Sequence, residues 1–403
     1  MHVVVLGAGV VGITTAYYLA GAGHSVTIVE CASEVATGAS GANGGQLSYS
    51  FTDALASPAL LSKLPWMVSG QDSAFRVRPP ISDLPICWGW AFLQQCTRQR
   101  AAENTLAVLE MSLRSAVLMT ELQEKVSLDF SFRQAGKLVL LNTYSEIQAT
   151  KKVCAVKREL GSDVQVVTRE QAMEIEPALT HMQTSFAAAV YSKSDSVGDA
   201  NSFTTQLGQW LVTQSDFDIK FNTTVERINV RAGTFYAIET DNGTIKADAV
   251  VVCMGAWSEQ ILKPLRIQPN IYPVRGYSLT LTPGEKAHNV SISDLKNKMV
   301  YSRIGDQIRI SGFADFVGFN TSGDKQRTRK LLDTARHFAP RLANYDASDS
   351  HEWGGFRPMT PNSQPLVGPS KIKGVYLNTG HGMLGWTLAC AAGHDLAVSI
   401  KSD

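Results

Sequence analysis

The sequence predicts an α/β fold with two domains, one built on a parallel sheet and one on a mixed or antiparallel sheet. Within the first thirty residues, an apolar strand, a glycine-rich turn, a helix and a second strand form one βαβ unit. Strand ends that carry glycine recur in the middle and near the end of the chain. Residues 271–319 instead alternate between apolar and polar side chains, which is typical of antiparallel sheet. We therefore expect both domains to be discontinuous in sequence.

The individual elements follow from periodicity and turn signals. The N-terminal unit places strands at Val3–Leu6 and Val26–Val29 around a helix at Ile13–Gly21. Further helices are expected at 103–126, 145–160, Ser202–Gln214 and from Trp386 to about Val398. Further strands are expected at Lys137–Leu141, Asp218–Phe221, Val225–Val230 and Val375–Leu377. Tyr236–Thr240 and Thr244–Val252 are predicted to pair as a hairpin around an Asp-Asn-Gly turn.

Composition and charge exclude several classes of protein. The chain has 403 residues, which suits two or three domains, and its 37 basic and 36 acidic residues nearly cancel. No basic run appears, so nucleic acid is not the expected partner. The six cysteines form no CxxC pair, so we expect reduced thiols and no metal site. With no signal-like start and no apolar stretch of about 18 residues, a cytoplasmic location is expected.

The first glycine turn has the pattern GxGxxG between a strand and a helix. Gly7 permits the tight turn, Gly9 lets the backbone approach a pyrophosphate, and Gly12 allows close packing of helix on strand. The following helix offers unpaired N–H groups and its positive dipole end to phosphates. Glu30, at the end of the second strand, can accept hydrogen bonds from ribose hydroxyls. This context predicts a dinucleotide rather than a merely glycine-rich turn.

Three later segments favour a flavin over a nicotinamide dinucleotide. A small, polar stretch suits backbone contact with a bulky planar ligand, and its candidate contacts are Ser40, Asn43, Gly44, Gly45 and Gln46. Gly255 follows a buried-type strand, and Gly380, His381, Gly382, Met383 and Leu384 precede the last helix. The dipole of that helix can stabilise negative charge on a reduced flavin ring. A glycine-rich turn without a ligand is the alternative, and His381 is expected to be a hydrogen-bonding or flavin contact, not a base.

These motifs resemble the FAD-dependent amino-acid oxidoreductases related to D-amino-acid oxidase and glycine oxidase, and more closely the bacterial D-amino-acid dehydrogenases of small-subunit type. The resemblance covers nearly the whole chain. It is carried by Val4–Gly12, Ala42–Gln46, Pro273–Thr280, Val317–Asn320, Arg357–Pro361 and Asn378–Thr387. It implies FAD as cofactor. It also implies a discontinuous FAD-binding Rossmann-like domain (1–80, 195–270 and 345–403) and a substrate-binding domain (81–194 and 271–344).

Arg357 is the residue that we expect to bind substrate. A guanidinium is a planar fork that matches a carboxylate in two hydrogen bonds, and the resemblance implies this role for the arginine of a Gly-Phe-Arg-Pro motif. An arginine paired with an acid at a domain interface is the alternative. Tyr272, Tyr277 and Tyr301 are candidates for a further hydrogen bond to the carboxylate, although tyrosines in strands more often serve packing. Arg275 and Arg303 are alternates for binding the anion.

The resemblance implies oxidative deamination of a D-amino acid, D-proline and D-hydroxyproline included. Cα hydride would pass to flavin N5, and the imine would hydrolyse to a 2-oxo acid. Electrons would go to a quinone or another non-oxygen acceptor. An oxygen-using oxidase, a nicotinamide dehydrogenase, and a flavin-binding subunit of a hetero-oligomeric dehydrogenase are the alternatives. The sequence leaves the substrate, the acceptor, the partner subunits and the oligomeric state open.

Residues 58–93 contain three tryptophans, Pro58, Pro65 and several leucines in a stretch too interrupted to span a bilayer. Such a stretch can lie in the membrane interface, peripherally on the inner face of the cell membrane, and approach a quinone. The alternative is that its side chains cover the flavin or pack between the domains.

Overall fold

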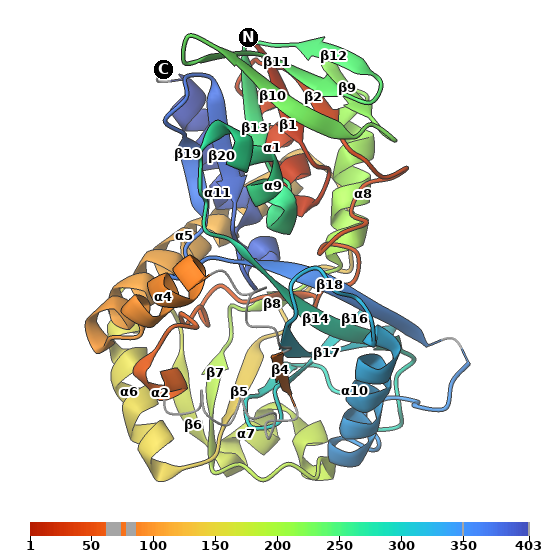
Figure 1. Ribbon diagram of the computed structural model, residues 1–403. Helices are drawn as coiled ribbons and strands as arrows, with labels where there is room; N and C mark the ends of the chain where they lie inside the picture. The colour runs from red at the N-terminus through yellow and green to blue at the C-terminus, as the bar shows by residue number, and fades with distance from the viewer. Residues whose placement is uncertain (62–73, 78–85, 349, 402–403) are drawn as a thin grey trace.

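A computed structural model describes residues 1–61, 74–77, 86–348 and 350–401 of the chain (Figure 1). The elements form two lobes, and both termini lie in the upper lobe in Figure 1. The upper lobe contains a six-stranded sheet, and the lower lobe contains a nine-stranded sheet. The mixed α/β fold that the sequence predicts is therefore confirmed.

The six-stranded sheet has the order β19-β20-β13-β1-β2-β9. Its strands are β1 (His2–Leu6), β2 (Ser25–Val29), β9 (Phe217–Lys220), β13 (Ala249–Val252), β19 (Leu366–Pro369) and β20 (Val375–Thr379). All pairs are parallel except β19 with β20. The sheet is covered on both faces, as parallel sheets usually are. Val3 and Val5 pack in one hydrophobic cluster, whereas Val4 and Leu6 pack in another.

Different elements cover the two faces. The first cluster contains residues of α1 (Val10–Gly21), α5 (Arg98–Lys125), α8 (Ala200–Leu211) and α11 (Gly385–Lys401). The second contains residues of α9 (Ser258–Leu262) and of a three-stranded sheet formed by β10 (Val225–Arg231), β11 (Thr234–Thr240) and β12 (Gly243–Lys246). The predicted helices at 103–126, 145–160, Ser202–Gln214 and Trp386–Val398 correspond to α5, α6 (Tyr144–Glu159), α8 and α11, with different ends.

The hairpin prediction was wrong in one respect. Thr244–Val252 is not one strand, because it divides into β12 and β13, which lie in different sheets. The Asp248 N–H donates to the carbonyl of His2 at the point where the chain enters the parallel sheet. Each of the four β13 residues is buried, whereas β12 is mostly exposed, so burial separates the two strands.

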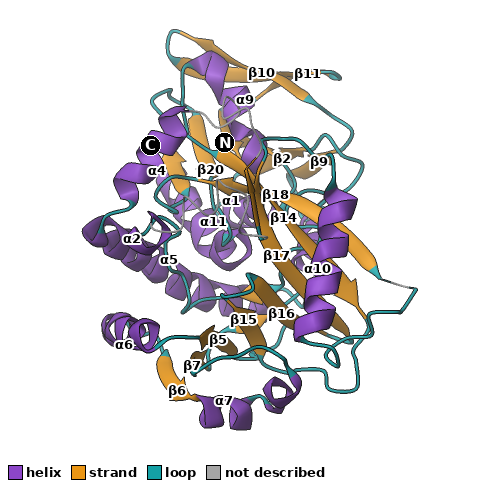
Figure 2. Cartoon of the chain, turned by 60° about the horizontal axis from the view of Figure 1, so that its bottom comes forward, coloured by secondary structure: helices purple, strands orange, loops and turns teal. Residues whose placement is uncertain are grey.

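The nine-stranded sheet has the order β18-β14-β17-β16-β15-β5-β7-β6, with β4 beside β17. These strands are β4 (Phe75–Val77), β5 (Lys137–Leu141), β6 (Gln165–Thr168), β7 (Ala188–Ser192), β14 (Tyr272–Leu281), β15 (Ser291–Asp294), β16 (Met299–Ile304), β17 (Gln307–Phe316) and β18 (His351–Met359). Figure 2 shows α10 (Asp324–Phe338) lying along β14 and β17. A two-stranded pair joins β3 (Gln46–Leu47) to β8 (Ser196–Val197).

Three segments pair or pack across the boundaries of the two predicted domains. β18, inside the 345–403 segment assigned to the FAD-binding domain, pairs along its whole length with β14. β4, inside 1–80, pairs with β17. α5, assigned to the substrate-binding domain, contributes Met119 and Leu122 to the core under the parallel sheet. Strand pairing and helix packing between distant segments decide where these three elements lie.

The two faces of the nine-stranded sheet differ in polarity. Leu138, Leu279 and Ile310 point into an apolar core that also contains residues of α7 (Arg169–Ile175) and α10. The opposite face, here called the polar face, is polar at its centre, where residues 42–48 cover it, and apolar beside Val139 and Val190 and beside Val274 and Met359. There Ser278 Oγ donates to the Ala42 carbonyl, and Lys137 Nζ donates to Ser48 Oγ at 2.6 Å. The polar face therefore looks toward the glycine-rich segments of the upper lobe.

Candidate cofactor and substrate site

In the glycine turn after β1, neighbouring backbone leaves no room for a side chain at Gly7 or Gly12. Gly7 has φ +99°, and a Cβ there would lie 3.0 Å from the carbonyl oxygen of Cys253. A Cβ at Gly12 would overlap the carbonyl oxygen of Gly7. Gly9 is the N-cap of α1 and provides no side-chain cap, and the Val10 N–H donates to Ser40 Oγ at 3.0 Å. The turn thus presents backbone at the positive end of α1, where a pyrophosphate is stabilised.

Glu30 lies beside this turn at the end of β2. Its Oε2 accepts the Ala8 N–H at 2.7 Å, and its Oε1 accepts the Ala32 N–H at 2.9 Å. The side chain is only partly buried, and a carboxylate has about four acceptor sites. It can therefore hold the loop and still accept hydroxyl groups.

The segment from Ser40 to Gln46 lies against the polar face of the nine-stranded sheet. A Cβ at Gly44 would lie 2.8 Å from Ser311 Oγ, and a Cβ at Gly45 would overlap Ile304 Cδ1. Asn43 Oδ1 accepts the Gly45 N–H at 2.9 Å, and Arg309 donates to the Asn43 carbonyl. The glycines here allow backbone to approach the sheet closely.

The loop before α11 lies beside β18. The Gly382 N–H donates to the Pro358 carbonyl at 2.9 Å, and His381 forms a β-bridge with Met359. The His381 side chain is 3% exposed, and burial lowers its pKa from 6.5 to about 3, so the imidazole is neutral. Met383 is 56% exposed, and Leu384 is partly exposed.

Gly380 and Gly255 meet near the ends of two parallel strands. Gly380 has φ +77° and follows β20, whereas Gly255 has φ +53° and follows β13. Thr379 Oγ1 donates to the Gly255 carbonyl at 3.1 Å. Because β13 and β20 are adjacent parallel strands, the two glycines belong to the same edge of the sheet, at its carboxyl end.

Arg357 lies on the polar face of the nine-stranded sheet, two residues from Met359. Its Nη1 donates to the Phe313 carbonyl at 2.8 Å, and the residue is of intermediate exposure. Burial lowers the pKa of the guanidinium, which nonetheless stays charged. In the described part of the chain, no carboxylate forms an ion pair with it. The remaining N–H groups of the fork can therefore receive an anion.

Tyr277 and Tyr301 do not lie with Arg357. Both are buried in the apolar core on the other face, at 1% and 0% exposure. Tyr277 OH donates to Asp315 Oδ2 at 2.9 Å, and Tyr301 OH contacts Met299 Sδ. Alternation along β14 explains this: a guanidinium over Gly276 requires that Tyr277 point the other way. The tyrosine prediction overlooked this alternation.

Buried polar atoms near the glycine-rich segments indicate a ligand with hydrogen-bonding edges. Gln46 Nε2, His381 Nε2 and Asn378 Oδ1 are buried, and the residues that the structure describes offer them no hydrogen-bond partner. Leaving such groups unpaired costs about 1–3 kcal/mol each. Together with the glycine turn and the N-terminus of α1, which has no side-chain cap, these atoms fit a flavin dinucleotide. The ring and phosphates of such a ligand offer hydrogen-bond donors and acceptors.

A set of charged residues that the sequence did not predict lies behind Arg357. Asp315, Arg327 and Arg76 form ion pairs within the nine-stranded sheet and its neighbour α10. Asp315 lies in the alternating run of β17, but no local pattern joins it to residue 76 or 327.

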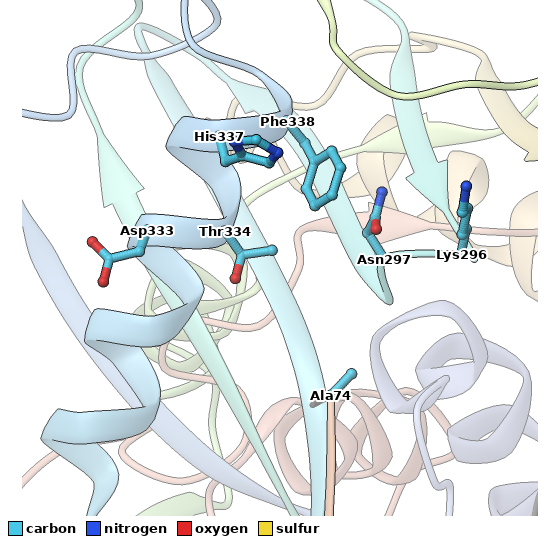
Figure 3. Close-up of a pocket in the computed structure, with 7 residues that line it drawn as sticks. All are labelled: Ala74, Lys296, Asn297, Asp333, Thr334, His337 and Phe338. Atoms are coloured by element: carbon cyan, nitrogen blue, oxygen red, sulfur yellow. The ribbon is translucent and has the colours of Figure 1, made fainter. Parts of the chain in front are cut away.

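Two pockets lie in different parts of the molecule. One of about 430 Å³, on the α10 side of the nine-stranded sheet, is lined by Ala74, Lys296, Asn297, Asp333, Thr334, His337 and Phe338 (Figure 3). The second, of about 240 Å³, includes Ala256, Ile271 and Phe319. A Cβ at Gly380 would lie 3.6 Å from Ile271, so the second pocket adjoins the loop before α11.

The segment 58–93 is described only in part, since 62–73 and 78–85 lie outside the described residues. Trp88, in α4 (Ile86–Gln95), is 3% exposed and donates from Nε1 to the Met359 carbonyl. Ile86 and Trp90 are 85% and 64% exposed. Within the described ranges, no helix is long and apolar enough to cross a membrane, and no group of His, Cys, Asp and Glu could hold a metal.

Comparisons with known proteins agree with this geometry. The family model "FAD dependent oxidoreductase" matches residues 2–398. The chain is 37% identical to D-amino acid dehydrogenase 2 of Ralstonia nicotianae, over 98% of this chain and 96% of the relative. It is 35% identical to the D-amino acid dehydrogenase of Dechloromonas aromatica, over 100% and 97%.

Solved structures share the fold at lower identity. L-proline dehydrogenase from P. horikoshii has a TM-score of 0.77 at 19% identity, covering 100% of this chain and 93% of that one. Glycine oxidase from Bacillus cereus has a TM-score of 0.74 at 22% identity, covering 100% and 95%. The glycine turns and these matches together show that the chain belongs to the family of FAD-dependent oxidoreductases.

Proposed function

We propose that the protein oxidises a D-amino acid whose carboxylate is held by Arg357. The observation that carries this proposal is the Arg357 guanidinium over Gly276, which has one carbonyl partner and no described carboxylate partner. The names of the curated relatives support the D-configuration. A planar carboxylate satisfies two N–H groups of such a fork at once.

The residues around the two glycine turns would hold FAD. Gly7, Gly9, Gly12 and the N-terminus of α1 would face the pyrophosphate, and Glu30 would accept ribose hydroxyls. Ser40, Asn43–Gln46, Gly255 and Gly380–Leu384 would surround the remainder. Bound FAD would supply the oxidising power, because it accepts the two electrons that the amino acid loses.

The protein's own part is to bind and orient. Arg357 would fix the substrate carboxylate and thereby the direction of the Cα–H bond. The neutral His381 can donate or accept a hydrogen bond but carries no charge that would compete for the carboxylate. The imine that leaves the site would hydrolyse in water to a 2-oxo acid and ammonia.

We propose a quinone or another non-oxygen compound as electron acceptor, in keeping with the dehydrogenase names of the relatives. The substrate would be a D-amino acid or a cyclic imino acid such as D-proline or D-hydroxyproline. The exposed residues of α4 offer a surface through which such an acceptor, a membrane surface or a partner subunit could approach.

The test is anaerobic bleaching of the flavin absorbance with matched D- and L-amino acids, D-proline and D-hydroxyproline included. Bleaching by D-isomers alone, followed by slow recovery in air and fast recovery with a soluble quinone, is expected. Fast recovery in air would indicate an oxidase. No bleaching by any amino acid would refute the proposed substrate class.

A further inference from the structure

A fully buried carboxylate, Asp315, lies behind Arg357 in the nine-stranded sheet. Its Oδ1 accepts a hydrogen bond from Arg327 Nη2 at 2.7 Å. Its Oδ2 accepts the Tyr277 hydroxyl at 2.9 Å and pairs with Arg76 Nη2 at 2.8 Å. A buried ion cluster is costly to desolvate, and a hydrophobic cluster of similar size is often as stable. Its presence next to the candidate site therefore calls for an explanation other than stability.

The cluster lies at a β-bulge. Arg275 of β14 pairs with Asp315 of β17, whereas Tyr277 pairs with Gly312, so the register shifts between them. Two residues of β17, Phe313 and Ala314, consequently lie opposite Gly276. Bulges of this kind redirect individual groups and are frequent beside active sites.

Phe313 adopts an unusual conformation in this bulge. Its φ is +60°, in the left-handed region that costs a residue with a side chain about 1–2 kcal/mol. In this conformation the side chain and the backbone carbonyl of Phe313 point to opposite faces of the sheet. The ring is 3% exposed in the apolar core, while the carbonyl accepts the hydrogen bond from Arg357 Nη1 on the polar face.

Arg327 and Asp315 hold the bulge in this conformation. The Arg327 guanidinium lies 4.5 Å from the centre of the Phe313 ring while it pairs with Asp315. Arg327 also donates to the Ala74 carbonyl, which in turn accepts the Ala314 N–H at 3.0 Å. The ring and the next two residues of β17 are thus fixed on one side, and the Phe313 carbonyl is left facing Arg357.

We propose that Asp315 and Arg327 are positioning residues for Arg357. They hold the β17 bulge so that the Phe313 carbonyl fixes one arm of the guanidinium and orients the rest of the fork toward a substrate carboxylate. This inference rests on the proposed function of Arg357. It predicts that loss of Asp315 or Arg327 weakens carboxylate binding. FAD binding and the rate at which bound substrate is oxidised should change little.

The test uses the flavin-loaded protein with Asp315→Asn and Arg327→Lys. The first keeps the shape of Asp315 and removes its charge, and the second keeps a charge and removes the planar fork over Phe313. We expect KM to rise on the order of tenfold to a hundredfold, the scale of an active-site group misplaced by up to about 1 Å, with kcat changed much less. The Kd of benzoate, a planar carboxylate without an amine, should rise in parallel in a flavin-absorbance titration.

Arg341→Met is the matched control, because Arg341 forms an exposed ion pair with Glu285 in the same lobe. It should leave KM and the benzoate Kd unchanged. Unchanged values in Asp315→Asn and Arg327→Lys would overturn the inference, as would a loss of FAD and thermal stability that accounts for the whole effect. If Asp315→Asn does not fold, Arg327→Lys decides alone.

Arg357→Ala, measured alongside, shows which idea has failed. An Arg357→Ala protein with unchanged KM refutes the proposed function itself. An impaired Arg357→Ala protein beside unimpaired Asp315→Asn and Arg327→Lys proteins refutes only the positioning role.

Discussion

The guanidinium of Arg357 lies across Gly276 on the neighbouring strand, at a place where a side chain would displace it. A Cβ built on Gly276 would be 2.8 Å from Arg357 Nη1 and closer still to Cζ. Gly276 needs no unusual backbone conformation, so its role is to leave space. The glycine and the arginine, 81 positions apart (357 less 276), therefore form one functional unit.

Gly276→Ala should impair substrate binding while leaving the fold intact. The overlapping atoms are the end of a flexible side chain, so the guanidinium can move aside. We expect KM to rise roughly tenfold, the cost of about 1.4 kcal/mol in lost orientation, with FAD content unchanged. Gly354→Ala is the matched control on the opposite face, where a Cβ would be 2.7 Å from Arg275 Nη2. Equal effects of the two variants would contradict a special role for Gly276.

Removing Arg357 should raise KM more than any neighbouring change. Arg357→Ala loses about 2–5 kcal/mol of carboxylate binding if the charge pair is desolvated, and FAD should stay bound. Arg357→Lys keeps the charge but not the planar fork, so it should recover only part of this loss. Steady-state kinetics with an artificial acceptor measures both variants. Equal KM values for the wild type and Arg357→Ala would remove Arg357 from the site.

Gly12→Ala should abolish FAD retention. Its Cβ would overlap the Gly7 carbonyl, which is backbone and cannot move without opening the turn. Gly21→Ala, at the end of the same helix, is the control because nothing lies within 4 Å of its Cβ. We expect Gly21→Ala to be neutral or to stabilise by about 0.5–1 kcal/mol. The ratio of flavin to protein absorbance measures FAD retention, and the thermal midpoint measures stability. A fully flavinated Gly12→Ala protein would contradict the role of this turn.

Glu30→Ala should weaken FAD binding. It removes the acceptor for the Ala8 and Ala32 N–H groups and the proposed ribose contact. Hydrogen bonds to charged groups contribute about 1.5–3 kcal/mol, so the Kd of FAD should rise by roughly tenfold or more. Titration of the apoprotein with FAD, followed by protein fluorescence, measures this. A Kd equal to that of the wild type would exclude Glu30 from the FAD site.

Two buried histidines should make the fold less stable in mild acid. Burial lowers the pKa of both His288 and His381 from 6.5 to about 3. Below pH 6.5 the unfolded chain binds these protons and the folded chain does not, so stability falls as pH falls from about 6.5 toward 3. The slope is about 1.4 kcal/mol per pH unit for each histidine.

Asp195 has the opposite effect on the pH dependence of stability and offsets that of one histidine. Burial raises its pKa from 3.8 to about 6, so between these values the folded chain binds the proton that the unfolded chain releases. A net loss of stability should remain between pH 7 and pH 5. His288→Asn should reduce that loss by about 2 kcal/mol at most, as measured by urea unfolding at the two pH values. An unaltered pH dependence would show that His288 is not buried in its neutral form.

Local sequence determined the elements that depend on near neighbours. The βαβ unit, the glycine turn and Glu30 could be predicted because a strand, a turn and a helix follow one another within thirty residues, each with its own periodicity. The loop at Gly380–Leu384 was predictable for the same reason, since its glycines directly precede the apolar helix α11.

Tertiary structure alone decided which side chains meet. The prediction placed Tyr277 and Tyr301 with Arg357, but the alternation of β14 and β16 turns both tyrosines into the apolar core. The division of Thr244–Val252 between two sheets and the transfer of β18 to the nine-stranded sheet depend on pairing with distant strands. Pairing between strands that lie far apart in the sequence fixes the register and therefore the face of every side chain. For that reason the sequence could name Arg357, whereas only the fold brings Gly276, Phe313 and Asp315 to it.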